Sequence, residues 1–128
     1  MGDPIRLVLA DDDPAFLEAL SAALERDGRF EVIGLAADGR EAFRLGRALE
    51  PDVVVMDGEM PRLDGWESAR LLQESNANTR VLMVSGADPD VIAHRATSVG
   101  ISAFLSKTSF DEILDAVAEL AGGSDPPV

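Results

Sequence analysis

The sequence predicts an α/β fold in which one parallel sheet is covered by helices on both faces. Its length of 128 residues is typical of one domain with a single hydrophobic core. Short apolar runs alternate with segments of helical apolar spacing, and this alternation occurs five times along the chain. A repeated strand and helix order implies parallel strands, because each helix returns the chain to the edge where the next strand begins.

Five runs rich in valine and isoleucine are the expected strands. Strands of a parallel sheet are buried on both faces, so they are apolar throughout instead of alternating with polar residues. The runs are Ile5–Ala10, Val32–Ala36, Val53–Met56, Val81–Val84 and Ala103–Leu105.

The expected helices show apolar stripes preceded by polar capping residues. The clearest stripes are Phe16, Leu17, Leu20 and Leu24; Ala42, Phe43 and Leu49; and Ile113, Leu114, Val117 and Leu120. The expected caps are Asp13 before Pro14, Asp38 with Glu41, Asp64, Asp88 before Pro89, and Ser109 with Glu112 as a capping box. Trp66 is expected to pack at the start of the helix that follows Asp64.

Glycines mark the expected helix ends and the end of the domain. Gly28, Gly100 and Gly122 stand where helices are expected to stop. We therefore expect the domain to span residues 1–121. Residues 122–128, Gly-Gly-Ser-Asp-Pro-Pro-Val, have the composition of a flexible tail or of the start of a linker.

Composition restricts the possible functions. The formal net charge of −13 would repel a nucleic acid backbone, so direct nucleic acid contact by this chain is not expected. No apolar run approaches the roughly 20 residues of a membrane span, and no secretory signal is visible. The absence of cysteine excludes disulfides, and we expect a cytoplasmic protein. Ten of the eleven basic residues are arginines, and Lys107 is the single lysine.

Chemically active side chains follow four of the expected strands. Asp11 and Asp12 follow the first strand, Asp57 the third and Lys107 the fifth, while Ser85 ends the fourth. Ligands of open parallel sheets bind beyond the carboxyl ends of the strands, where these side chains would meet. Two carboxylates about 5 Å apart repel by about 3 kcal/mol at an effective dielectric of about 20. A bound cation would remove this repulsion, and oxygen ligands select Mg²⁺ or Mn²⁺.

The loop Asp57–Gly65, Asp-Gly-Glu-Met-Pro-Arg-Leu-Asp-Gly, together with the residues above, resembles the receiver domain of two-component response regulators. The resemblance covers the chain from Ile5 to Ala121. It implies a flavodoxin-like fold with strand order 2-1-3-4-5 and a signalling domain instead of an enzyme. Asp57 would accept a phosphoryl group from a histidine kinase or a phosphotransfer protein, assisted by Lys107.

The resemblance also implies a metal site and a switch. Asp12 and Asp57 would bind the metal directly, Asp11 mainly through water, and Glu59 through its backbone carbonyl.

Ser85 would turn to bond the phosphoryl group, and Phe104 on the fifth strand would rotate with it. The fourth helix, fifth strand and fifth helix would then form the output face, with a possible homodimer there.

Five positions depart from the commonest receiver pattern, are variable in it, or invite another interpretation. Thr108 stands where proline is common, so a trans peptide bond is expected after Lys107. Ser85 replaces a threonine, and Glu59 and Ala87 occupy variable positions beside the site. His94 is interpreted as a surface residue instead of a phosphocarrier.

Two other functions remain open from the sequence. One is a metal-dependent phosphohydrolase with an aspartyl nucleophile, which in the haloacid dehalogenase-like pattern needs a second aspartate at position 59, where this chain has glutamate. The other is a docking receiver that works without phosphorylation.

The tail also resembles that of receivers that precede a DNA-binding domain.

Overall fold

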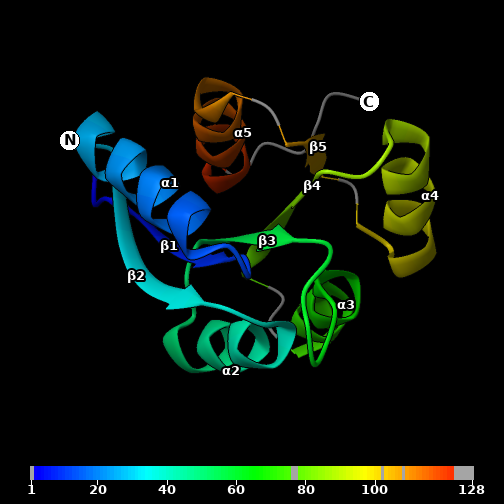
Figure 1. Cartoon of the computed structure of the whole chain (residues 1–128). Coiled ribbons are helices and arrows are strands. Elements are labelled where there is room, and N and C mark those ends of the chain that lie inside the picture. Colours follow the sequence, from blue (N-terminus) through cyan, green and yellow to red (C-terminus); the bar gives the residue numbers. More distant parts are fainter. Residues whose placement is uncertain (1, 76–77, 102, 108, 123–128) are drawn as a thin grey trace.

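The computed structural model describes residues 2–75, 78–101, 103–107 and 109–122. Strands and helices alternate along this part of the chain, as the sequence predicts (Figure 1). The strands are β1 Ile5–Ala10, β2 Phe30–Ala36, β3 Val53–Asp57, β4 Arg80–Ser85 and β5 Phe104–Ser106. The helices are α1 Pro14–Asp27, α2 Gly39–Leu49, α3 Gly65–Ser75, α4 Pro89–Val99 and α5 Phe110–Ala121.

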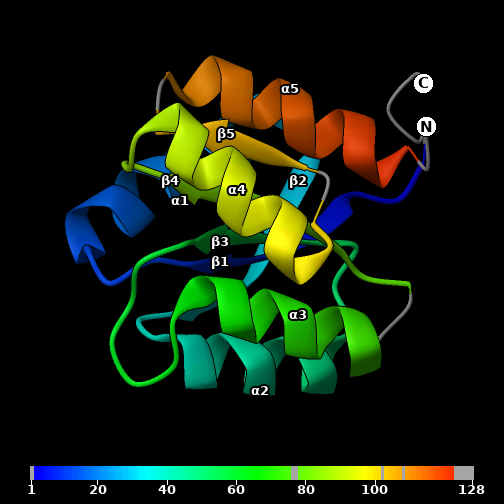
Figure 2. The same ribbon diagram turned by 90° about the vertical axis from the view of Figure 1, so that its right-hand side faces the viewer.

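The strands form one parallel sheet in the order β2-β1-β3-β4-β5, which confirms the expected topology. Helices α1 and α5 cover one face, and α2, α3 and α4 cover the other (Figures 1 and 2). Alternate residues of a strand point to opposite faces. In β1, Leu7 and Leu9 therefore join the core beneath α1 and α5, whereas Val8 and Ala10 join the second core.

The prediction that every strand is buried on both faces is correct only for the centre of the sheet. All of β3 is buried, as are β1 from Leu7 and β4 from Val81. The outer strands β2 and β5 each have one neighbour, and Leu35 on β2 and Phe104 on β5 are 46% and 37% exposed. An edge position leaves part of a strand uncovered, so apolar composition alone did not separate edge strands from central ones.

Most of the predicted helix caps are present. The side chains of Asp13, Asp38, Asp64 and Asp88 each accept a hydrogen bond from a backbone N–H in the first turn of the following helix. The capping box at Ser109 is wrong, because the Ser109 side chain makes no cap hydrogen bond. Ser109 is exposed, so water can bond the free N–H groups at the start of α5. The acidic side chains of Asp111 and Glu112 in the first turn interact favourably with the positive end of the helix dipole.

The predicted helix ends are confirmed. Gly28 and Gly100 follow α1 and α4 with positive φ angles of 92° and 76°, and Gly122 follows α5 with a φ of −69°. The expected tail beyond Gly122 and the peptide bond to Thr108 lie outside the described residues. Within the part of the chain that the structure describes, no helix has the length and apolar character needed to span a membrane.

Candidate functional site

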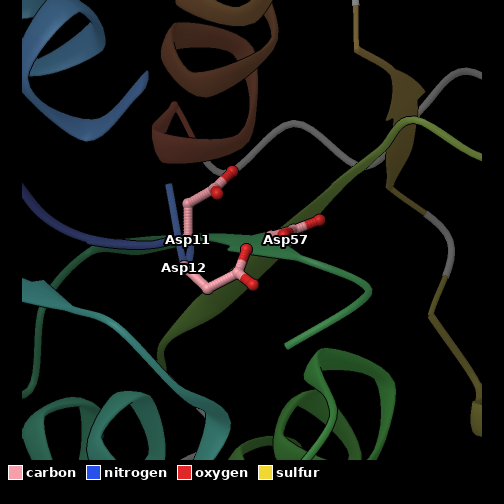
Figure 3. Close-up of side chains that lie close together, drawn as sticks. All are labelled: Asp11, Asp12 and Asp57. Carbon is pink, nitrogen blue, oxygen red and sulfur yellow. The ribbon is translucent and has the colours of Figure 1, made fainter. Parts of the chain in front are cut away.

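The carboxyl edge of the sheet brings together three carboxylates from two adjacent strands. Asp11 and Asp12 directly follow β1, and Asp57 is the last residue of its neighbour β3. One ligand oxygen from each of these residues lies within 4.8 Å of the others. Figure 3 shows the three side chains gathered at this edge. The sequence-based prediction that these side chains meet is therefore confirmed.

Lys107 supplies the positive charge of this cluster. Its Nζ lies 2.9 Å from Asp11 Oδ2 and 3.9 Å from Asp57 Oδ1. The same ammonium lies 4.8 Å from the centre of the Phe16 ring, which favours a cation at that position. Burial lowers the pKa of Lys107, but the bond to Asp11 and the charges of the three aspartates outweigh it and raise the pKa. The lysine therefore remains charged at neutral pH.

The carboxylates differ in burial and in hydrogen bonding. Asp11 and Asp57 are 2% and 5% exposed, whereas Asp12 faces solvent. Asp11 Oδ1 accepts a hydrogen bond of 2.8 Å from the backbone N–H of Asp13. Asp11 Oδ2 is buried and, among the described residues, has no hydrogen-bond partner of good geometry, although the Lys107 ammonium faces it. A buried oxygen of this kind remains available for a further electropositive partner.

The environment of Asp57 raises its pKa above that of an ordinary aspartate. Burial and the charge of Asp11 raise the pKa of Asp57 to about 6, although Lys107 and a 3.4 Å hydrogen bond from the Glu59 N–H lower it. A carboxylate with this pKa is mostly ionised at pH 7. Because burial and the charge of Asp11 both disfavour the ionised carboxylate, a cation that enters the site would stabilise it.

The donor set fits a small divalent cation. Ligand oxygens of an ion bound at about 2.1 Å lie at most about 4.2 Å apart, and the three carboxylate oxygens here lie within 4.8 Å of one another. All three are hard oxygen donors, which Mg²⁺ and Mn²⁺ prefer. Asp11 Oδ2, which faces the Lys107 ammonium without a hydrogen bond of good geometry, adds to the negative potential there. The residues present therefore fit the Mg²⁺ or Mn²⁺ that the sequence predicts.

The loop after Asp57 is closed tightly onto the strand. The Gly65 N–H donates to the Gly58 carbonyl at 2.9 Å, which joins the start of α3 to the end of β3. A Cβ atom at Gly65 would lie 1.7 Å from the Asp57 carbonyl oxygen, so a larger residue does not fit. A Cβ atom at Gly58 would lie 2.5 Å from Trp66 Nε1. Trp66 is 3% exposed at the start of α3, as the sequence predicts.

The side chain of Glu59 is the feature that sequence reasoning missed. Ser85 is fully buried and donates its hydroxyl proton to Glu59 Oε1 at 2.6 Å, while Ser85 Oγ accepts from the Ala87 N–H at 3.1 Å. The other carboxylate oxygen of Glu59 accepts from Trp66 Nε1 at 3.3 Å. From the sequence, Glu59 is expected to offer its backbone carbonyl to a metal, to occupy a variable position, and to replace the aspartate of the haloacid dehalogenase-like pattern. The position of Glu59 in the sequence does not indicate that its side chain bonds Ser85 on β4 and Trp66 on α3.

Two other residues singled out in the sequence lie apart from the carboxylate cluster. Phe104 on β5 lines a cavity of about 330 Å³ between β5 and α4 that also includes Pro89 and Ile92. His94 is exposed on α4, in agreement with its interpretation as a surface residue.

Comparison with known proteins agrees with this geometry. The family model for the response regulator receiver domain matches residues 7–118. The chain is 38% identical to the probable transcriptional regulatory protein NarL of Mycobacterium tuberculosis, over 96% of this chain and 57% of that protein. The chain thus spans about half the length of this curated relative. Because the relative is named as a transcriptional regulator, it lends no support to our expectation that nucleic acid contact is absent.

Solved structures of receiver domains have the same fold. The signal receiver domain of the putative response regulator NarL from Mycobacterium tuberculosis has a TM-score of 0.89 at 35% identity, covering 96% of this chain and all of that one. The response regulator domain of Thermotoga maritima CheB has a TM-score of 0.85 at 31% identity, covering 97% of this chain and all of that one. On the evidence of its sequence, its sheet order and its aspartate cluster, this chain belongs to the response regulator receiver domain family of two-component signalling systems.

Proposed function

We propose that Asp57 accepts a phosphoryl group from a histidine kinase or a phosphotransfer protein and that the domain acts as a switch instead of turning over a substrate. The observation that carries this proposal is the Lys107 ammonium, which lies 2.9 Å from Asp11 Oδ2 and 3.9 Å from Asp57 Oδ1. One cation beside a cluster of carboxylates is suited to hold the negative oxygens of a phosphoryl group next to an attacking carboxylate.

In the proposed reaction a carboxylate oxygen of Asp57 attacks phosphorus. The new bond joins this oxygen to phosphorus, and the bond from phosphorus to the donor breaks, with the electron pair leaving on the donor atom. Asp57 is mostly ionised at pH 7, since its pKa of about 6 lies below that pH. Lys107, whose pKa is raised, keeps its charge to bond an oxygen of the incoming group.

Asp11, Asp12, Asp57 and the backbone carbonyl of Glu59 are the proposed ligands of Mg²⁺ or Mn²⁺. When bound, such an ion supplies charge neutralisation at the phosphoryl oxygens. Asp57 would contribute a ligand oxygen as well as the attacking oxygen, and Asp12, which faces solvent, would contribute its carboxylate.

Incubation with acetyl phosphate and magnesium tests this proposal. The intact mass of the wild type should increase by one phosphoryl group, and hydroxylamine should remove it, as expected for an acyl phosphate. Asp57→Asn should reduce this incorporation by at least 100-fold. Persistence of the added mass in Asp57→Asn would show that another residue, such as His94, is the acceptor. Sustained turnover of a small phosphate ester would instead identify a phosphohydrolase.

We further propose that phosphorylation changes the face formed by α4, β5 and α5, with a partner or a homodimer as the outcome. Phe104 is exposed there and borders the cavity beside Ile92, so it has room to change its rotamer. Sedimentation at matched phosphorylated fractions should show that Phe104→Ala associates at least fivefold more weakly than the wild type. Equal association of the two proteins would exclude Phe104 from the output face.

A further inference from the structure

The Ser85 hydroxyl already has a strong acceptor in this structure. It donates its single proton to Glu59 Oε1 at 2.6 Å, and its oxygen accepts from the Ala87 N–H at 3.1 Å. A serine hydroxyl has one proton to donate. A second strong acceptor, such as a phosphoryl oxygen, therefore has to displace Glu59 before it can bond Ser85.

Glu59 is itself oriented by a second partner. Its Oε2 accepts a hydrogen bond of 3.3 Å from Trp66 Nε1, and the Trp66 indole is held close to the backbone of Gly58. The Glu59 side chain thus bridges the end of β4 and the start of α3. Because Glu59 is exposed at the surface, its substitution does not open a hole in the core.

We propose that Glu59 is a positioning residue that holds the Ser85 hydroxyl away from the phosphorylation site until Asp57 carries a phosphoryl group. The inference rests on the proposed function of Asp57. A phosphoryl group and the Glu59 carboxylate compete for one proton, and their like charges repel one another. Phosphorylation therefore transfers Ser85 from Glu59 to the phosphoryl group and leaves Glu59 with Trp66 alone.

The displaced carboxylate also affects the contact between α3 and α4. The Arg95 guanidinium on α4 lies 5.8 Å from the Trp66 ring, and Arg95 Nη2 lies 3.2 Å from Asp64 Oδ2. Glu59, Trp66, Ser85 and Arg95 line the same small cavity, of about 110 Å³. Loss of the Ser85 hydrogen bond removes one of the two donors to the Glu59 carboxylate, so its negative charge beside Trp66 is less neutralised, and the effect reaches α4 through Arg95.

Tryptophan fluorescence measures this transfer directly, since Trp66 is the single tryptophan and the chain has no tyrosine. Acetyl phosphate and magnesium serve as the phosphodonor, and intact mass gives the phosphorylated fraction. The wild type should show a fluorescence change on phosphorylation. Per phosphorylated molecule, this change should be at least fivefold smaller in Ser85→Ala and in Glu59→Ala.

The variant Glu59→Gln keeps the size of the side chain, so it tests whether the hydrogen bonds of Glu59, and not its packing alone, position the Ser85 hydroxyl. Ser85 and Trp66 donate to different oxygens of the Glu59 carboxylate. A glutamine side chain places an NH₂ group where one of these oxygens lies, so one of the two donors loses its acceptor. Its fluorescence response should therefore fall between those of the wild type and Glu59→Ala. Glu119→Gln, which removes an exposed carboxylate on α5, should respond as the wild type does.

A double-mutant cycle in the absence of phosphodonor tests the hydrogen bond between Ser85 and Glu59 in the unphosphorylated protein. Glu59→Ala should lower the equilibrium constant for folding, measured in urea, about tenfold more in the wild type than in Ser85→Ala. Additive effects of the two substitutions would overturn the inference, as would equal fluorescence changes in phosphorylated wild type and Ser85→Ala. A wild type that gains no phosphoryl mass would refute the proposed function instead, and the cycle would still decide whether Glu59 holds Ser85.

Discussion

The two ends of the sheet use polar residues in opposite ways. At the amino end, the Arg6 N–H donates to Asp52 Oδ2 at 2.8 Å, and the Asp52 N–H donates to the Arg6 carbonyl at 2.9 Å. The Arg6 guanidinium also donates to the carbonyls of Leu49 and Glu50 at 3.1 Å each. The buried Thr79 hydroxyl donates to the Pro51 carbonyl at 2.9 Å. Each of these contacts joins a donor to an acceptor, and none places like charges together.

At the carboxyl end, like charges face one another. Asp11, Asp12 and Asp57 lie together, the Lys107 ammonium pairs with Asp11 and Asp57, and an oxygen of Asp11 has no hydrogen bond of good geometry. Satisfied polar groups stabilise a fold, whereas crowded carboxylates lower its stability and raise its affinity for cations. In this domain, polar residues at the amino ends of the strands stabilise the fold, whereas those at the carboxyl ends form the chemically active site.

The largest expected effect is a gain of stability on removing the Asp57 charge. In chelator-treated buffer at pH 7, Asp57→Asn should raise the free energy of unfolding by roughly 3 kcal/mol, since a rise in pKa from 3.8 to about 6 corresponds to that amount. The protonated carboxyl is favoured in the folded state, so the wild type loses this stability as the pH rises from about 4 through 6.

Urea denaturation of both proteins between pH 4 and pH 8 measures this effect. The advantage of Asp57→Asn should be complete above pH 7 and should vanish below about pH 4, where Asp57 is protonated in both the folded and the unfolded chain. An advantage independent of pH would mean that the burial and crowding of the Asp57 charge are not its cause.

A smaller effect is expected from magnesium at the carboxyl end. At ten times its dissociation constant, an ion that binds only the folded state should stabilise the wild type by about 1.4 kcal/mol. Thermal unfolding with increasing magnesium should show a rise in melting temperature that Asp12→Ala loses. An equal rise in Asp12→Ala, or no rise in the wild type, would refute the assignment of the ligands.

The smallest effect is expected at the amino end. Thr79→Val keeps the shape of a buried side chain but leaves the Pro51 carbonyl without its hydroxyl donor, which should cost about 1 kcal/mol. The loss, measured by urea denaturation, should be the same at pH 5 and pH 8 and with or without magnesium. A dependence on magnesium would show that the two ends of the sheet are coupled.

The parts of the molecule that follow from strand position were predictable from the sequence. Asp11, Asp57 and Lys107 come after apolar runs, and the geometry of a parallel sheet brings such positions to one edge. The strand boundaries were correct to within two residues, because buried runs end where polar residues begin.

Features that depend on side-chain direction were not predictable. The bond between Ser85 and Glu59 joins residues 26 positions apart through a carboxylate at an exposed loop position. The exposure of Phe104 depends on β5 being an edge strand, which its apolar residues did not reveal. At Ser109, the spacing of a capping box is present without the hydrogen bond, since spacing does not fix a rotamer.

The tight closure between Gly58 and Gly65 has a consequence for how this site can evolve. The intervening segment is a loop with a fixed base, because its ends are bonded at 2.9 Å and Gly65 has no space for a side chain. A substitution of an exposed side chain within the loop, such as that of Glu59, changes the contacts of that side chain but leaves the base of the loop closed. Insertions or deletions would instead displace α3 from the strand. A substitution in the loop can therefore change the surroundings of Asp57, whereas a change in loop length would disturb the closure at its base.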